Sequence, residues 1–431
     1  MKFDTVIIGS GLAGLASGIR LAEAGKSCAI VSSGQSSLYF SSGSMDFLAR
    51  LPDGSEVTHP LHALSELTRQ APHHPYSRIG EKKVASLAYQ AEKLIRDSGL
   101  VMTGSASQNH YRVTPVGRQR MTWLSPARVP VRELERPFKW ESVVVIGIAG
   151  FLDFQPGIVA SALQRQGVKA SAQEIHLPFL DRLRDNPSEF RSVNIAHLLD
   201  LPQSLTLIAE EISRLAQGYE AVFLPACIGL ETDQVVQALQ IQVQKPVYLL
   251  PTLPPSLLGI REDQLLHTRF RHFGGVIMTG DTVNGVEMAE NHITGLYTRN
   301  HGDIPLRASH VILATGSFFS NGLKAQFDRV YEPLLDLDLL AYSSREQWTR
   351  QNVFTPQPYL KFGVTTDEYL RPLKSGQVVK NLYAAGAVLG GYDPLFEGCG
   401  AGVSLLSALF VAEQIITGQR VTKQRIPEIA Q

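Results

Sequence analysis

A glycine-rich turn near the start of the chain constrains the fold more than any other feature. Residues 5–8 form a β-branched run that predicts a buried strand. Gly9-x-Gly11-x-x-Gly14 follows, then a helical pattern, and residues 28–31 predict a second strand. This order of strand, turn, helix and strand is the opening of a dinucleotide-binding fold.

The three glycines have separate expected roles. Gly9 permits the tight turn, Gly11 lets the backbone approach a pyrophosphate, and Gly14 lets the helix pack closely on the strand. The helix N-terminus then offers free N–H groups and the positive end of its dipole to the phosphates. We therefore predict a nucleotide phosphate here; the alternative is a glycine-rich turn without a ligand.

The acid that normally binds the adenosine ribose at the end of the second strand is absent. Ser32 ends that strand, and no Asp or Glu occurs between Glu23 and Asp46. Three interpretations stay open: a neutral side chain such as Ser32 substitutes, the adenosine half is held loosely, or that half is not present.

The composition excludes several classes of protein. The 431 residues contain 40 Lys and Arg against 40 Asp and Glu, so the formal net charge is zero, and 44% are hydrophobic. A disordered chain would carry more charge, and a nucleic-acid-binding protein would show a basic excess, so we expect no nucleic-acid partner. Charged residues are only 19%, below the roughly 25% of average domains, which suggests a surface that contacts other protein chains.

The three cysteines, Cys28, Cys227 and Cys399, lie far apart and form no C-x-x-C motif. A disulfide framework or a cysteine-ligated iron–sulfur cluster is therefore not expected, and we predict no metal site. The N-terminus lacks the pattern of a signal peptide. The longest apolar run, residues 143–152, is shorter than the about 20 residues of a membrane span, so no direct span is expected.

The predicted fold class is α/β, a Rossmann-like domain in two pieces with a smaller α/β domain inserted. The pieces are residues 1–132 and 265–431, and strands alternate with helices in the insertion, residues 133–264. The insertion begins with a second glycine turn after Val143. Ala149 and Leu152 replace its second and third glycines, so we interpret it as structural.

Later motifs extend the pattern to most of the chain. They are Ser41-Ser42-Gly43-Ser44, Ala314-Thr315-Gly316, Phe362-Gly363-Val364-Thr365-Thr366-Asp367, Leu382-Tyr383-Ala384-Ala385-Gly386 and Gly398-Cys399-Gly400-Ala401-Gly402-Val403. This series resembles the flavoproteins of the fumarate reductase and aspartate oxidase type. By that resemblance the chain binds a flavin, and the last glycine-rich turn and its helix cover the flavin ring. The chain departs from those families at Ala387, where they usually carry an acid.

A closer resemblance is to the B subunits of anaerobic glycerol-3-phosphate dehydrogenase. It is carried by Phe40-Ser41-Ser42-Gly43-Ser44-Met45-Asp46, Leu249-Leu250-Pro251-Thr252-Leu253-Pro254-Pro255-Ser256 and Thr298-Arg299-Asn300-His301, among others. The family implies a complex with two partner chains, a flavin dehydrogenase subunit and an iron–sulfur membrane-anchor subunit. It oxidises sn-glycerol 3-phosphate to dihydroxyacetone phosphate and passes electrons to quinone, with fumarate or nitrate as terminal acceptor. The expected location is the cytoplasmic side of the inner membrane, peripheral through the partner subunits.

The expected cofactor is a flavin: FMN by family resemblance, with FAD possible from the glycine-rich fold. The predicted cofactor-binding residues are Gly9, Ser10, Gly11, Leu12, Ala13, Gly14, Ser32, Ser41, Ser42, Gly43, Ser44, Thr315, Gly316, Gly386, Ala387, Gly400, Ala401, Gly402 and Val403.

The catalytic residues stay unassigned, with three weak candidates. A phosphate substrate needs Arg or Lys, and oxidation of an alcohol needs a base, often His. Arg371, Arg299 and His301 stand in the matching motifs, although a lone Arg or His is more often structural. Whether the substrate binds this chain or the flavin dehydrogenase partner stays open. Two alternative functions remain: a stand-alone flavin oxidoreductase acting on a small dicarboxylate, and a non-catalytic flavin-fold assembly protein.

Overall fold

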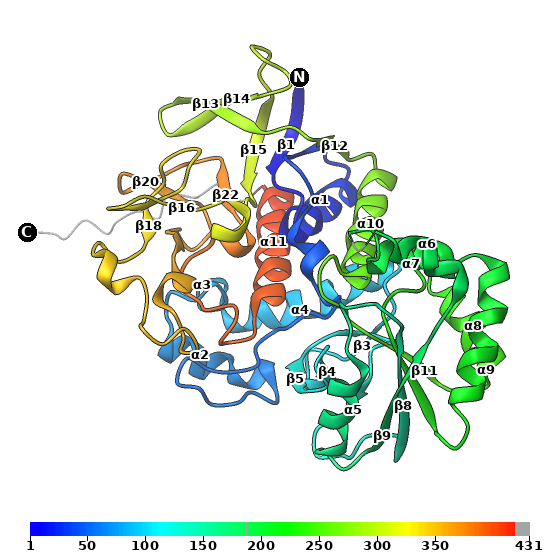
Figure 1. The fold of residues 1–431 in the computed structure, drawn as a ribbon. Coiled ribbons are helices and arrows are strands. Elements are labelled where there is room, and N and C mark those ends of the chain that lie inside the picture. Colours follow the sequence, from blue (N-terminus) through cyan, green and yellow to red (C-terminus); the bar gives the residue numbers. More distant parts are fainter. Residues whose placement is uncertain (187, 419–431) are drawn as a thin grey trace, which may run out of the picture.

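The computed structural model describes residues 1–186 and 188–418, which form two parallel sheets surrounded by helices (Figure 1). The first sheet has the strand order β12-β2-β1-β15-β22. Its strands are β1 (Lys2–Ile8), β2 (Cys28–Ser32), β12 (Val276–Thr279), β15 (Arg307–Leu313) and β22 (Leu382–Ala384). Each pairs in parallel with its neighbours, so residues far apart in sequence share one sheet edge.

Three helices pack next to one another against this sheet. They are α1 (Leu12–Glu23), α10 (Leu257–His272) and α11 (Gly400–Thr417), and α11 runs through the centre of the molecule beside α1 (Figure 1). Helix α4 (Glu81–Asp97) covers α11 from another side. Strand β2 is fully buried and β1 is buried from Thr5 to Ile8, as parallel strands covered by helices must be.

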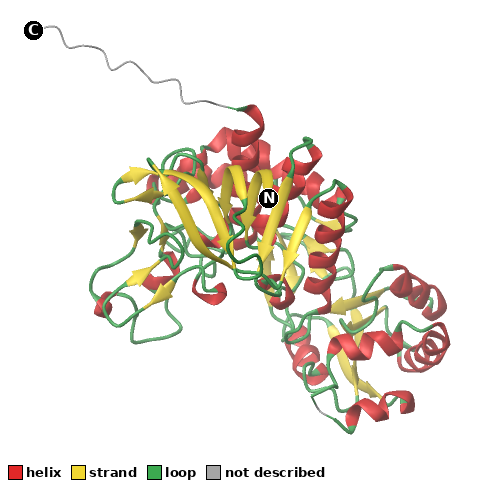
Figure 2. Cartoon of the chain, turned by 90° about the horizontal axis from the view of Figure 1, so that it is seen from above, coloured by secondary structure: helices red, strands yellow, loops and turns green. Residues whose placement is uncertain are grey.

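The second sheet has the order β11-β10-β8-β9 and lies to one side of the first (Figure 2). Its parallel strands are β8 (Ser142–Ile148), β9 (Lys169–Ile175), β10 (Ala221–Pro225) and β11 (Val247–Leu250). The helices of this region are α5 (Pro156–Gln164), α6 (Asp181–Arg184), α7 (Ser192–Leu199), α8 (Pro202–Leu215) and α9 (Gln234–Val243). A separate hydrophobic core fills this half of the molecule.

Short elements complete the structure. The helices are α2 (Leu64–Gln70) and α3 (Pro75–Ile79). The paired strands are β3 (Met102–Thr103), β4 (His110–Val113), β5 (Gln119–Thr122), β6 (Ser125–Pro126), β7 (Val131–Arg132), β13 (Val283–Ala289), β14 (His292–Thr298), β16 (Lys324–Ala325), β17 (Val330–Tyr331), β18 (Leu339–Leu340), β19 (Gly363–Val364), β20 (Leu373–Lys374) and β21 (Gln377–Val378). Single-turn helices are η1 (Ser37–Phe40), η2 (Pro60–Ala63), η3 (Pro178–Leu180), η4 (Phe318–Ser320), η5 (Arg345–Gln347), η6 (Pro358–Lys361) and η7 (Gly386–Val388).

Among the described residues, α11 is the single helix with the length and apolarity of a membrane span. Most of its side chains are buried against α1, α4 and the first sheet. The core helix of a folded protein meets the same criteria of length and composition. Its apolar character is therefore explained by its central position.

The predicted α/β class with parallel sheets is confirmed. The boundary predicted between residues 264 and 265 falls inside α10, which is one continuous helix. Leu257 and Leu258 belong to the second core, whereas Leu266 and Phe270 belong to the first. We keep the three-part division, 1–132, 133–264 and 265–431, as a proposal in which α10 joins the inserted part to the main part.

The packing of Phe270 generates a stability prediction. This fully buried ring fills the space beside Gly18 and Gly275; a Cβ on Gly275 would lie 2.3 Å from the ring. We expect Phe270→Ala to lower the free energy of unfolding by about 3–5 kcal/mol because it leaves a cavity. Phe354 is 95% exposed, so Phe354→Ala should change the free energy of unfolding by less than about 0.5 kcal/mol. Urea unfolding followed by tryptophan fluorescence measures both, and equal losses would contradict this packing.

Candidate functional site

The glycine-rich turn lies between β1 and α1, and its glycines differ in what surrounds them. A Cβ on Gly9 would lie 2.3 Å from the carbonyl oxygen of Ala314, and one on Gly14 would lie 1.9 Å from that of Gly9. A Cβ on Gly11 would meet no atom of the described residues within 4 Å. Gly9 and Gly14 therefore serve close backbone packing, while Gly11 faces open space, as expected of the position that approaches a pyrophosphate.

The first turn of α1 is open to an anion. Gly11 is its N-cap and supplies no side-chain cap, and the first turn contains no acidic residue. Leu12, Ala13 and Gly14 carry N–H groups at the start of the helix, where backbone donors have no partner within the helix. These donors and the positive end of the helix dipole favour a negatively charged group at this point.

Ser32 at the end of β2 is hydrogen-bonded on both sides. Its hydroxyl donates to the carbonyl oxygen of Gly34 at 2.9 Å, so the 2.6 Å contact with Ser10 has Ser10 as donor. Ser32 thus fixes the turn beside the glycine motif. Its own carbonyl accepts from the N–H of Asp281, a buried acid that no sequence motif revealed because it follows a distant strand, β12.

Arg299 and His301 lie together around Asp281. His301 Nδ1 is 3.0 Å from Asp281 Oδ2, and Arg299 donates to the carbonyl oxygen of Gly280 at 2.8 Å. Asp281 also accepts from the backbone N–H groups of Thr282 and Asn300. Both candidate residues therefore stand at the end of β2, on the side of Ser32, where they hold the segment after β12.

The loop of residues 41–44 presents polar groups beside α10. The hydroxyls of Ser41 and Ser42 accept from the N–H groups of Gly43 and Ser44. Gly43 has φ +75°, and a Cβ there would lie 2.9 Å from the Cβ of Leu258. The Ser44 hydroxyl is buried, and no atom of the described chain forms a hydrogen bond with it. Because a buried hydroxyl without a partner is costly, this group suits contact with a ligand.

The loop after β15 places a second free hydroxyl near the glycine motif. Thr315 Oγ1 is buried and lacks a hydrogen-bond partner within the described residues. The carbonyl of the preceding Ala314 touches Gly9, which brings this loop against the first turn. Gly316 has φ +80°, a conformation that favours glycine. The exposed rings of Phe40 and Phe319 meet edge to face at 5.2 Å and join the loops after β2 and β15.

The single-turn helix η7 connects the first turn of α1 to α11. A Cβ on Gly386 would lie 2.7 Å from the Cβ of Ala13, and the N–H of Gly386 donates to Ser407 within α11. A Cβ on Gly402 would lie 2.2 Å from the Tyr76 hydroxyl. Like α1, α11 has no acid in its first turn and no side-chain cap. Ala387, in η7, Gly400, Ala401 and Val403 complete this group of predicted residues.

Arg371 is tied to its own motif. Its guanidinium contacts Asp367 Oδ2 at 2.7–2.8 Å and stacks over the Tyr369 ring, 5.2 Å from the ring centre. Among the described residues, no hydrogen bond or ion pair joins it to Arg299 or His301. The three catalytic candidates therefore fall into two separate groups, one at the end of β2 and one in the segment before β20.

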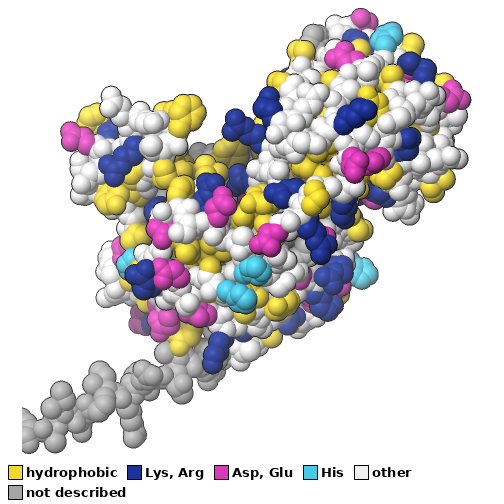
Figure 3. All heavy atoms as spheres, turned by 90° about the horizontal axis from the view of Figure 1, so that it is seen from below, with side chains coloured by type: hydrophobic (Ala, Val, Ile, Leu, Met, Phe, Trp, Pro, Cys, Tyr) yellow, Lys and Arg dark blue, Asp and Glu magenta, His cyan; other side chains and the backbone are white. Residues whose placement is uncertain are grey.

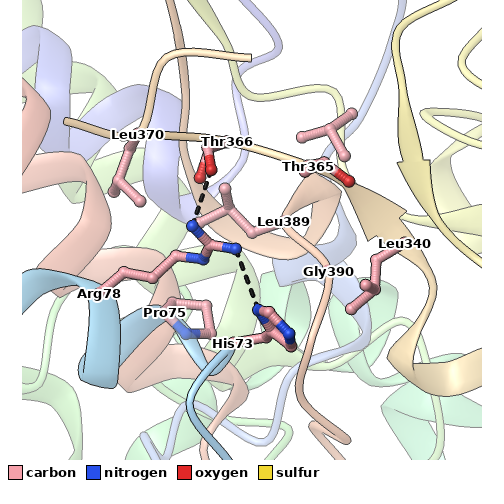
Figure 4. A pocket seen from close by; sticks show the side chains of 10 residues that line it. His73, Pro75, Arg78, Leu340, Thr365, Thr366, Leu370, Leu389 and Gly390 are labelled. Atoms are coloured by element: carbon pink, nitrogen blue, oxygen red, sulfur yellow. Dashed lines mark hydrogen bonds between the residues drawn. The ribbon is translucent and has the colours of Figure 1, made fainter. Parts of the chain in front are cut away.

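A small pocket next to this segment contains an arginine that sequence reasoning missed. Figure 4 shows Arg78 of α3 between His73 and Thr366. Arg78 donates to the carbonyl oxygen of Thr366 at 2.7 Å and lies 3.2 Å from His73 Nδ1. The pocket holds about 10 Å³, room for a single water molecule, so it does not admit a phosphate ester with these side-chain positions.

Glu262 of α10 is a second residue that sequence reasoning missed. It is buried one helical turn after Leu258, and neither carboxyl oxygen has a hydrogen-bond partner among the described residues. Burial, and then the neighbouring Asp263, raise the pKa of Glu262 to about 8. At neutral pH this carboxyl is therefore mostly protonated, which the sequence pattern of an amphipathic helix does not reveal.

The second glycine turn is filled by protein. The guanidinium of Arg184 donates to the carbonyl oxygen of Ala149 at 2.9 Å, and a Cβ on Gly147 would meet Pro156 at 2.8 Å. A hollow of about 900 Å³ on this half is lined by Ser142 and Lys169, which start β8 and β9. The hollow lies at the amino ends of these strands, whereas ligands of parallel α/β sheets bind at the carboxyl ends, and the glycine turn at the carboxyl end of β8 is filled. Neither feature is therefore typical of a nucleotide site.

The predicted residues fit a flavin nucleotide. The open N-terminus of α1, the open face of Gly11 and the unpartnered hydroxyl of Thr315 lie at the carboxyl ends of β1 and β15, and Ser44, in the segment after β2, offers a second unpartnered hydroxyl. Figure 3 shows a hollow between two projecting parts of the molecule, with hydrophobic side chains and Lys or Arg on its walls. Such a site can bind phosphates at the helix N-termini and an aromatic ring against apolar side chains.

Comparison with known proteins agrees with this geometry. The family described as "FAD binding domain" matches residues 4–403. The B subunit of anaerobic glycerol-3-phosphate dehydrogenase from Yersinia pestis bv. Antiqua is 60% identical over 98% of this chain and 100% of that protein. The proteins of the same name are 55% identical in Pectobacterium atrosepticum and 43% identical in Glaesserella parasuis. Each match covers 96% of this chain, with 99% of the Pectobacterium protein and 100% of the Glaesserella protein aligned.

The different surroundings of Gly11 and Gly14 generate a paired prediction. Gly11→Ala places a methyl group in open space with φ −72° unchanged, so we expect the melting temperature of the apoprotein to stay within about 2 °C while bound flavin falls several-fold. Gly14→Ala collides with the backbone of Gly9 and should lower the melting temperature itself. The ratio of flavin to protein absorbance and a thermal melt separate the two. Normal flavin content in Gly11→Ala would show that no ligand approaches this glycine.

Proposed function

The chain belongs to the family of anaerobic glycerol-3-phosphate dehydrogenase B subunits, and we propose that it oxidises sn-glycerol 3-phosphate to dihydroxyacetone phosphate within that complex. It is a flavin-dependent oxidoreductase and forms part of a multi-subunit enzyme. When bound, the flavin supplies hydride acceptance and one-electron release, which no side chain provides.

One observation carries the proposal: the first turns of α1 and α11 contain no acid, and Gly386 of η7 packs between Ala13 in the first turn of α1 and Ser404 and Ser407 of α11. In our proposal the N–H groups of Leu12, Ala13 and Gly14 bind the flavin phosphates. The first turn of α11, Gly400 to Val403, faces the flavin ring and stabilises negative charge on it. Ser44 and Thr315 donate or accept through their free hydroxyls.

FAD is the favoured flavin. The matching family is described as an FAD binding domain, and the fold retains the complete opening of a dinucleotide site. The ribose acid is absent at Ser32, which instead orders the turn with Ser10. We propose that the adenosine half lies over this polar turn. The resemblance predicted FMN instead, and chromatography of the released flavin distinguishes FMN from FAD.

The partners follow from the family. We propose that a flavin dehydrogenase subunit and an iron–sulfur membrane-anchor subunit assemble with this chain. Electrons then pass through them to quinone, and the chain works at the cytoplasmic side of the inner membrane, held there through its partners. The three cysteines are buried and lie apart in the sequence, so this chain offers no cysteine set for an iron–sulfur cluster. Electrons leaving the flavin therefore need a partner chain.

Substrate reduction of the bound flavin tests the function. We expect the purified chain to be yellow and acid-released flavin to elute with FAD. Glycerol 3-phosphate should bleach the flavin absorbance band in the presence of both partner subunits. Omitting each partner in turn then shows whether the substrate binds this chain or the flavin dehydrogenase partner, since bleaching of the lone chain requires a substrate site here.

Two results would replace the proposal. Turnover of fumarate, succinate or aspartate by the lone chain with a soluble dye would identify a stand-alone dicarboxylate oxidoreductase. Full activity of a complex that contains a flavin-free Gly11→Trp chain would identify a flavin-fold assembly protein. A chain that retains neither FAD nor FMN would contradict both the dehydrogenase function and the stand-alone oxidoreductase function.

A further inference from the structure

Three titratable side chains meet in a sealed cluster at the start of α11. They are His74, Glu397 and Cys399, all fully buried. His74 Nε2 lies 3.4 Å from Glu397 Oε2, and Cys399 Sγ lies 3.8 Å from each of these two atoms. His74 and Cys399 are 325 residues apart in sequence, so the fold alone assembles the cluster.

The spacing of the cluster resembles three corners of a metal site, but the histidine tautomer opposes a metal. His74 Nδ1 accepts a hydrogen bond from the N–H of Tyr76 at 3.0 Å, which caps α3. The neutral ring therefore carries its proton on Nε2, the atom that would have to bind the metal. Histidines that bind metals usually donate through their other nitrogen instead.

The protons of the cluster converge on one carboxylate oxygen. His74 Nε2–H points to Glu397 Oε2, and the Cys399 thiol donates to the same atom. Burial, and then Glu397, raise the pKa of Cys399 well above its usual value, so the thiol keeps its proton. Glu397 Oε2 is thus the common acceptor of the cluster.

The second carboxylate oxygen of Glu397, Oε1, lies on the side of the cluster nearest to solvent. Within the described chain Glu397 Oε1 forms no hydrogen bond, and Lys361 Nζ lies 3.8 Å from it. The Lys361 side chain is 45% exposed, whereas Glu397 has no exposed surface. An ion pair therefore connects the buried carboxylate to solvent.

We propose that Glu397 is a proton carrier for the flavin reaction, with His74 and Cys399 as positioning residues and Lys361 as its contact with solvent. The proposal rests on the proposed function, because Cys399 is the N-cap of the helix assigned to the flavin ring. Oxidation of an alcohol to a ketone transfers a hydride to the flavin and releases the hydroxyl proton. Glu397 takes up that proton and passes it to water beside Lys361; no group of the cluster changes oxidation state.

Other titratable groups surround the cluster. Tyr76, Tyr392, Asp393, Asp46 and Lys361 are the groups that act on it electrostatically. Burial raises the pKa of Asp393, and the Glu397 charge adds to this, although the N–H groups of Phe396 and Leu395 oppose it. Asp46 is paired with Arg120 at 2.7 Å. Lys361 is thus the one cation of the described residues, apart from a protonated His74, within ion-pair distance of Glu397.

Two variants of the assembled dehydrogenase test the proposal. Glu397→Gln keeps the shape of the side chain but cannot take up a proton. We expect it to retain flavin, to lose about tenfold or more of its turnover, and to show a larger solvent isotope effect. A nearby carboxyl changes the slope of a plot of the flavin reduction potential against pH. We expect this change of slope to be absent in Glu397→Gln.

Lys361→Met tests the proton-carrier proposal at a side chain that is 45% exposed, so this substitution should leave folding intact. Loss of a neighbouring positive charge favours the neutral form of a carboxyl group, and the proposal takes the carboxylate as the active form. The rising limb of the pH profile should therefore move to higher pH. Lys82→Met, at an exposed lysine of α4, is the matched control and should leave the profile unchanged.

Unchanged pH profiles in both variants would overturn the proton carrier and leave the flavin function standing. One equivalent of zinc in the wild-type chain, lost in Glu397→Gln, would overturn it in favour of a metal centre. A wild-type complex without flavin in this chain would instead contradict the proposed function. If Glu397→Gln fails to fold, the shift in Lys361→Met alone decides the outcome.

Discussion

The structure depends on how closely the backbones of β1, α1 and the loop after β15 approach one another. Gly14 packs on the carbonyl of Gly9, and Gly9 packs on the carbonyl of Ala314, with no room for a Cβ at either glycine. This contact sets α1 directly over the end of β1. Gly386 of η7 then connects α1 to α11, because a Cβ there would lie 2.7 Å from the Cβ of Ala13 and its N–H donates to Ser407. A single pair of packing glycines thus positions the N-terminus of α1 in the candidate site.

Local patterns predicted the elements of this arrangement but not their pairing. The β-branched run before Gly9 and the helical pattern after the glycine motif indicated a strand and a helix close to the observed β1 and α1. That β12 lies beside β2, or that α10 belongs to both cores, depends on packing across more than 200 residues. The predicted boundary after residue 264 divided α10 because this helix is amphipathic toward two different cores, which a single hydrophobic period does not show.

In the candidate site, too, local patterns predicted some residue roles but not the pairing of distant residues. The roles of Gly9, Gly11 and Gly14 followed from the motif, since each role is a matter of local backbone geometry. Arg371 and His301 were chosen by residue type, and each is held by an acid, Asp367 or Asp281, whose pairing no motif indicated. Cys399 was noted as an unpaired cysteine and as part of the last glycine-rich motif, but its contacts with His74 and Glu397 were not predicted, because a cluster assembled from distant segments leaves no spacing to recognise.

Charge balance links the candidate nucleotide site to the buried cluster beside it. The chain carries as many acids as bases, yet the first turns of α1 and α11 contain no acid. Asp46, whose carbonyl accepts from Gly402 in the first turn of α11, is paired with Arg120. The first turn of α1 therefore remains available to an anionic ligand, whereas one N–H of the first turn of α11 is bonded to the Asp46 carbonyl. Glu397 lies two residues before the N-cap of α11 and has Lys361 at ion-pair distance. In our proposal this paired carboxylate exchanges a proton without cancelling the positive end of the helix dipole.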